Sequence, residues 1–168
     1  MINKPNSPGT YSLQAGASLI EVLVSVFILA FGILGIAAMQ AGALRNNQGA
    51  LEQSAAVFLT HSILDAMRAS MQPDADRPGT LVVREGYVTN DCIWQDPTVS
   101  DALVANDLSR WLKNIRDNLN GGETNENACG RIVCDADDPN LCTASVRWNN
   151  SRSLGGEAKQ DVETMSRL

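Results

Sequence analysis

The chain has 168 residues, a formal net charge of −6 and a charged fraction of 19%. This length allows one soluble domain in addition to a membrane-spanning segment. The acidic balance and the scattered arginines argue against a nucleic-acid partner, because binding to phosphates requires clustered lysine and arginine side chains.

Residues 1–16 are polar and include a single lysine, Lys4. They lack the arrangement of a secretory signal peptide, in which an apolar stretch precedes the cleavage site and is discarded. Here the small residues Ala15, Gly16 and Ala17 come before the apolar run. Cleavage after Gly16 would therefore leave the apolar run on the mature chain.

The apolar run covers residues 22–44 and contains no charged residue. As a helix it would be about 34 Å long, which is enough to cross a hydrocarbon core of about 30 Å. All four cysteines follow the run and indicate an oxidising compartment, so we expect the N-terminus inside and the domain outside. Glu21 stands directly before the run and needs an explanation.

The residues around Glu21 resemble the class III signal of type IV prepilins and pseudopilins, in which a glycine is followed by the pattern seen here as Ala17-Ser18-Leu19-Ile20-Glu21-Val22-Leu23-Val24-Ser25. The resemblance implies that prepilin peptidase cuts between Gly16 and Ala17 and then methylates Ala17. Ala17 replaces the phenylalanine that is commoner in the family.

The same resemblance implies that Glu21 pairs with the N-terminal amine of a neighbouring subunit during assembly. A lone carboxylate in the apolar layer costs about 2 to 3 kcal/mol, so pairing it with an ammonium group favours a defined axial register. The alternative is a plain signal anchor, in which Glu21 only sits at the level of the lipid headgroups.

Beyond Arg45 the sequence becomes amphipathic and predicts that the helix continues to about Ser70. Ala38 stands where many major pilins carry a proline, so we expect a continuous helix. Residues 72–79 contain two prolines and Gly79, which end it. The second half of this helix is expected to pack on the domain through apolar residues at helical spacing: Leu51, Ala55, Phe58, Leu59, Ile63, Ala66 and Met67.

The globular part is expected to contain one further helix and several strands. Residues 80–83, 86–89 and 92–95 have the composition of short extended segments. Ser100 is a candidate cap for a helix through Leu119, whose apolar stripe includes Trp111 as a core residue. Residues 130–134 and 141–148 predict an antiparallel hairpin, and residues 158–168 are compatible with an edge strand.

The four cysteines have intervening spacings of 36, 4 and 7 residues, without a C-x-x-C pair. These spacings favour disulfides over a zinc site. Three connectivities are possible, and the sequence leaves them open. We favour Cys134 with Cys142 across a short loop, which leaves Cys92 for Cys129.

No residue pattern indicates catalysis: the chain has one histidine, His61, and lacks a nucleophile elbow, a phosphate loop and paired carboxylates outside turns. We therefore expect no enzyme activity, no cofactor and no metal. Residues 135–140 carry three aspartates that could hold calcium, but aspartate is much commoner as a turn residue.

Together these patterns predict an α+β, pilin-like fold, with a long N-terminal helix packed on a small antiparallel sheet. Its expected divisions are a leader (1–16), a membrane-spanning and fibre-core helix (17–44), an amphipathic continuation of that helix (45–71) and a periplasmic globular domain (72–168).

Within the family, the first third of the chain is similar to PilV-type minor pilins, through residues 17–25, 31–35 and Met39-Gln40. Such proteins are implied to move from the inner membrane into the fibre, at its tip, with other minor pilins and the major pilin as partners. They prime assembly of the pilus used in twitching motility, attachment and biofilm formation. A minor pseudopilin of a type II secretion system and a membrane-anchored periplasmic binding or adhesion module are the alternatives.

Overall fold

The computed structural model describes residues 16, 18–119, 127–153 and 155–168. Its first element is α1 (Leu19–Ala69), a single helix that continues through Ala38 as expected. Contacts within the chain divide it into two units, residues 1–41 and 42–168, and α1 contributes to both.

In the first unit, every described residue is exposed within the chain. The apolar part of α1 has a mean hydropathy of 2.7 over 18 residues, and none of that window is buried. Among the described residues, α1 is the one helix long and apolar enough to cross a membrane.

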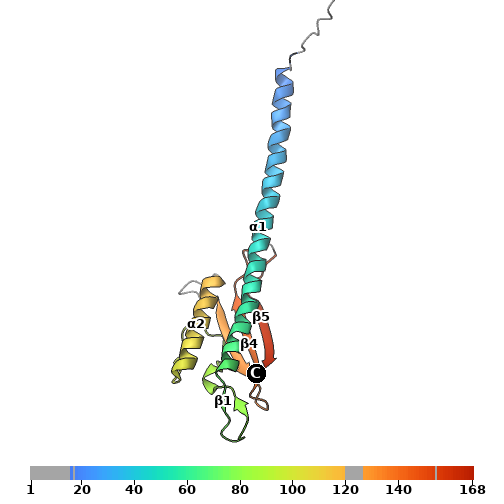
Figure 1. Ribbon diagram of the computed structural model, residues 1–168. Helices are drawn as coiled ribbons and strands as arrows, with labels where there is room; N and C mark the ends of the chain where they lie inside the picture. The colour runs from blue at the N-terminus through green and yellow to red at the C-terminus, as the bar shows by residue number, and fades with distance from the viewer. Residues whose placement is uncertain (1–15, 17, 120–126, 154) are drawn as a thin grey trace, which may run out of the picture. The chain divides into compact units, whose positions relative to one another are not determined.

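The second unit is built on an antiparallel sheet with the strand order β3-β4-β5 (Figure 1). These strands are β3 (Cys129–Cys134), β4 (Leu141–Trp148) and β5 (Gln160–Arg167). The hairpin β3–β4 and the edge strand β5 therefore confirm the three strands expected at the C-terminal end. Alternate residues of β4 are buried, so one face of the sheet is turned to the core.

The C-terminal part of α1 packs on the buried face of this sheet. Thr60 Oγ1 lies 2.7 Å from Thr164 Oγ1 of β5, and Arg68 Nη2 donates to Ser166 Oγ at 3.1 Å. Beside these polar contacts, α1 and the sheet bury apolar side chains in one core. Those of α1 are Ala56, Leu59, Ile63, Leu64 and Met67, and those of the sheet are Ile132, Ala144, Val146 and Trp148.

A second helix, α2 (Ala102–Asn118), covers the rest of the core with one apolar stripe. The expected cap residue, Ser100, is wrong by one position. Asp101 is the N-cap, and its carboxylate accepts from the Leu103 and Val104 amides at 3.0 and 3.4 Å. Aspartate and serine are both good caps, so composition alone does not choose between neighbours. The buried stripe consists of Val104, Leu108, Trp111, Leu112 and Ile115.

The segment between the helices differs most from expectation. A short hairpin of β1 (Gln72–Pro73) and β2 (Leu81–Val82) follows α1. The sequence predicted the extended segment that contains β2, but it predicted only a turn where β1 lies. Residues 86–89 do not form a strand, because η1 (Glu85–Tyr87) is a 3₁₀ turn. It places Tyr87 in the core with its side chain fully buried. Residues 92–95 contribute one isolated bridge, between Ile93 and Gly130.

Two disulfides are present, Cys92–Cys129 and Cys134–Cys142, in the pairing that the sequence favoured. The first joins the loop after η1 to the start of β3. The second joins residues that lie directly opposite each other in the β3–β4 register. The second unit is thus an α+β domain in which residues 42–69 of the long helix pack on a small antiparallel sheet, as the sequence predicted.

Candidate functional site

The candidate site is the start of α1, where the sequence predicts a leader cleavage site and a docking residue. The Ser18 carbonyl accepts from the Glu21 amide at 2.9 Å and from the Val22 amide at 3.2 Å. These are the first bonds of the helix, so Ser18 occupies the N-cap position. Gly16 lies just before it and is exposed, with no heavy atom within 4 Å of an added Cβ. Ala17, the expected methylation site, lies outside the described residues, as do residues 1–15.

Glu21 lies in the first turn of α1, with an exposed side chain. The described residues offer no hydrogen bond or ion pair to its carboxylate. A negative charge is favourable at a helix N-terminus, because the first amides of the helix are unpaired there. Within the described residues, Glu21 is thus an exposed acceptor at the start of an apolar helix.

The residues after Glu21 form an apolar surface on all sides of the helix. Leu19 is 82% exposed and Ile28 is 66% exposed, and both are typical of this stretch. Gly32 and Gly35 interrupt the surface, and nothing in the chain approaches within 4 Å of a Cβ added at either position. Surface of this kind is stable only in a bilayer or against other apolar surfaces, and glycines allow helices to approach closely.

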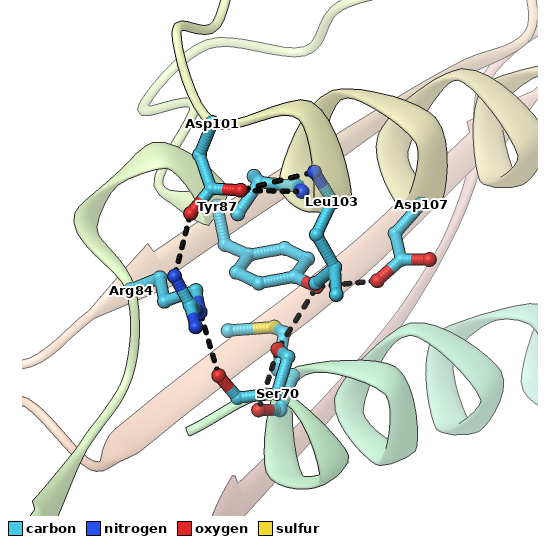
Figure 2. Close-up of polar contacts among 8 residues, drawn as sticks. Ser70, Arg84, Tyr87, Asp101, Leu103 and Asp107 are labelled. Atoms are coloured by element: carbon cyan, nitrogen blue, oxygen red, sulfur yellow. Dashed lines mark hydrogen bonds and ion pairs between the residues drawn. The ribbon is translucent and has the colours of Figure 1, made fainter. Parts of the chain in front are cut away.

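At the other end of α1, a partly buried polar cluster joins three elements of the domain (Figure 2). The Tyr87 hydroxyl donates to Asp107 Oδ2 of α2 at 2.5 Å, and it lies 3.0 Å from Ser70 Oγ at the end of α1. Arg84 donates to the Ser70 carbonyl at 2.7 Å and to Asp101 Oδ2 at 2.6 Å. The cluster therefore fixes the end of α1 to η1 and to the first turns of α2.

Burial, followed by the hydrogen bond to Asp107, raises the pKa of Tyr87 to about 12. The pKa of Asp101 is lowered: partial burial opposes ionisation, but the amides of Leu103 and Val104 and the Arg84 guanidinium outweigh it. Tyr87 stays neutral and Asp101 stays ionised over the ordinary pH range. The cluster has a structural role, because each of its residues is hydrogen-bonded to another residue of the cluster.

Sequence reasoning missed this cluster and one further polar contact of α1. The Glu52 side chain is only 9% exposed, and it lies 3.8 Å from Arg152 Nη2. Arg152 is 100 positions from Glu52, and Ser70 and Asp107 are 17 and 20 positions from Tyr87. No local pattern carries such a signal.

The aspartates predicted as turn residues form hydrogen bonds within the β3–β4 loop. Asp135 Oδ1 accepts from the Asp137 and Asp138 amides at 2.8 and 3.1 Å. Across residues 16, 18–119, 127–153 and 155–168, no group of three or more histidine, cysteine, aspartate or glutamate side chains is placed to hold a metal ion.

Comparisons with known proteins add no relative: no protein-family model, no curated protein and no solved structure matches the chain.

Proposed function

We propose that this chain is a type IV pilin-like subunit, of the PilV-type minor pilins, which primes and joins a pilus through contacts between subunits. The observation that carries the proposal is Glu21, a carboxylate with no partner among the described residues, in the first turn of a helix whose N-terminal half is apolar and exposed. It is the only charged residue of α1 before Arg45. Its place five residues after Gly16 matches the prepilin pattern.

In this proposal α1 has two successive environments. The bilayer covers its apolar surface before cleavage after Gly16, and neighbouring helices cover it afterwards. Cleavage creates a new ammonium group at Ala17, which would pair with Glu21 of a neighbouring subunit. Pairing the two removes the cost of an isolated carboxylate in an apolar layer, which is about 2 to 3 kcal/mol. A helix that slides along its neighbour out of this register would lose the ion pair and its stabilisation.

In this proposal the globular domain acts through contacts with other subunits. The Tyr87 cluster and the α1–sheet core hold residues 42–69 firmly, so that the domain would keep a fixed place along the helix to which it is attached. Partners in this scheme are prepilin peptidase, the major pilin and other minor pilins.

Processing provides the first test. Full-length chain incubated in membranes with prepilin peptidase should lose residues 1–16, and mass spectrometry should find a methylated Ala17 at the new N-terminus. The matched control is a chain with Gly16→Arg, which alters the residue before the cut and leaves α1 unchanged. A wild-type chain that stays intact under conditions that process a known prepilin would contradict the proposal and favour a simple membrane tether.

Deletion of the gene separates a pilus from a pseudopilus. Loss of surface pili and twitching motility with intact protein secretion supports the minor pilin. Loss of secretion with intact pili would instead support a minor pseudopilin, which would use the same helix and the same Glu21.

A further inference from the structure

The part of α1 that belongs to the second unit carries a row of large apolar side chains turned to solvent. Leu44, Leu51 and Phe58 are 70%, 71% and 70% exposed. They recur at every seventh position, which is about two helical turns, so they lie in one line along the helix. The domain packs on another face of α1, through Ala56, Ile63 and their neighbours. We call these three exposed side chains the outer row.

A bilayer is a poor cover for the outer row. The row begins at the last residue of the apolar run and extends about 21 Å beyond it along the helix. Exposed polar residues accompany Leu51 and Phe58 on α1, among them Asn47, Ser54 and His61. Apolar residues that repeat every seven positions are instead the pattern of helices packed side by side. The outer row therefore fits another helix better than it fits lipid.

The surface between two members of the outer row can receive a side chain. In packed helices, a side chain of one helix enters the space between residues i, i+3, i+4 and i+7 of the other. Between Leu51 and Phe58 the two middle residues are Ser54 and Ala55, which are small. Ser54 Oγ already donates to the Ala50 carbonyl at 2.9 Å, so covering its hydroxyl leaves no donor unpaired. A groove of about 450 Å³ opens beside Leu51 and Ala55, which gives an incoming leucine room.

The spacing of the outer row distinguishes between registers of two parallel helices. In an unshifted pair, Leu51 meets Leu51, but Asn47, Ser54 and His61 meet their own copies between the apolar layers. A shift by about half of the repeat, three or four residues, instead places each member of one row between two members of the other. The shifted pair therefore buries the apolar side chains without layers of facing polar side chains.

A shift of four residues is also the one that the N-terminal ion pair requires. Pairing the Ala17 ammonium group with Glu21 of a neighbouring copy sets position 17 of one helix level with position 21 of the other. Because α1 is a single helix, the same shift sets Leu51 level with Ala55. One feature is an ion pair and the other is a steric fit, so they specify the same shift independently.

We propose that the outer row binds the outer row of a second copy of this chain, with the helices parallel and shifted by four residues, so that Leu51 of one copy packs on Ser54 and Ala55 of the other. The parallel direction rests on the proposed function, in which α1 crosses the membrane the same way in every copy. Both domains stay on one side of the membrane. The contact needs no charged side chain, so the ion pairs of the domain are kept, including Glu52–Arg152 beside the groove.

Cysteine cross-linking of the full chain in a bacterial inner membrane tests the surface and the shift. All four native cysteines are in disulfides, so an introduced cysteine supplies the reactive thiol. L51C and A55C chains with tags of different length are co-expressed in cells without other pilins, and dimers are separated on non-reducing gels. The mixed dimer should predominate. Two Leu51 positions are about 6 Å apart along the axis at this shift, and their lateral separation takes them beyond disulfide range.

The matched control is Q53C, because Gln53 is exposed on a different face of α1 and should stay monomeric. Predominance of the L51C homodimer would overturn the proposal in favour of the unshifted pair. Cross-linking of Q53C at the level of the mixed dimer would overturn it as random collision. Absence of any mixed dimer would overturn the contact itself.

A second variant tests the apolar contribution. F58S should lower the yield of the mixed dimer about tenfold, because it removes apolar contact from both copies. Its thermal melting should match that of the wild type, since Phe58 lies outside the core. M165S is the matched control: Met165 is 67% exposed on β5, away from the outer row, and its loss should leave the yield unchanged. An unchanged yield in F58S would contradict the proposal.

The Gly16→Arg chain separates this proposal from the proposed function. Its leader stays attached, so the Ala17 ammonium group is not formed, but the outer row is intact and the mixed dimer should persist. Preferred cross-linking in a wild-type chain that prepilin peptidase leaves uncut would contradict the proposed function alone. Normal processing without preferred cross-linking would contradict the pairing of outer rows alone.

Discussion

The indole nitrogen of Trp111 donates a hydrogen bond to the carbonyl oxygen of Leu59 at 2.9 Å, so α2 is bonded directly to the packed part of α1. The Trp111 ring is buried, and it lies against Gly130 of β3, where an added Cβ would fall on it. Both helices and the sheet therefore meet at one side chain. This junction holds α1 against the domain.

Replacing Trp111 with phenylalanine should lower the free energy of unfolding by about 1 to 3 kcal/mol, through the lost donor and the smaller ring. Denaturant unfolding of the detergent-solubilised chain, followed by circular dichroism, measures the change. W94F is the matched control, because Trp94 is only partly buried. It should change stability by less than about 0.5 kcal/mol. Equal losses in the two variants would contradict the role of the junction.

Gly130→Ala should lower the free energy of unfolding by about 1 to 3 kcal/mol, because the new methyl group has to displace the Trp111 ring and Ile115 Cδ1, which lies 2.9 Å from the added Cβ. Gly42→Ala has nothing within 4 Å and should be neutral, or stabilising by up to about 1 kcal/mol, because alanine favours a helix. Thermal melting of both variants compares them directly. A G130A chain as stable as the wild type would contradict this prediction, because it would show that the Trp111 ring moves without loss of stability.

Stability should fall at high pH because of Tyr87. The pKa of its phenol is raised to about 12 in the folded chain, whereas an unfolded tyrosine ionises near pH 10. The neutral form is thus favoured by folding, and its contribution is complete below about pH 10 and is lost as the pH rises through about 12. The whole effect amounts to about 3 kcal/mol. Denaturant titrations from pH 9 to pH 12 should show this fall in the wild type and a smaller one in Y87F. The same fall in both would rule out Tyr87 as its source.

Removal of the two disulfides should have unequal effects. Cys92–Cys129 spans 37 positions and Cys134–Cys142 spans 8, so the first restricts the unfolded chain more. Chain-entropy arguments give losses of about 4 kcal/mol for C92A/C129A and about 2.5 kcal/mol for C134A/C142A. Denaturant midpoints of the two double variants, measured side by side, check the order. A reversed order would indicate that strand pairing, rather than loop length, decides the contribution.

Periodicity predicted the elements that have a long repeating pattern. The apolar run with its amphipathic continuation matched α1, and the stripe around Trp111 matched α2. Alternation in residues 141–148 matched β4 without error in its bounds. The structure of residues 80–89 was harder to predict. Valine and tyrosine, here Val82, Tyr87 and Val88, do not by themselves distinguish a strand from a 3₁₀ turn. Three-residue elements depend on their tertiary contacts, and Tyr87 is placed by Ser70 and Asp107.

The candidate site was predictable to a different extent. Gly16 and Glu21 stand out by their place relative to the apolar run, which is a local signal. The proposed role of Glu21 involves another chain, so it stays a prediction.

The fate of Glu21 variants tests the central proposal most directly. In cells that lack the native copy, E21A and E21D chains should both insert into the membrane and be cleaved after Gly16. Immunoblots of sheared pili should then contain the wild type and, in reduced amount, E21D, which keeps a carboxylate. E21A should be missing from the sheared fraction. Recovery of E21A in sheared pili at the wild-type level would contradict docking through Glu21.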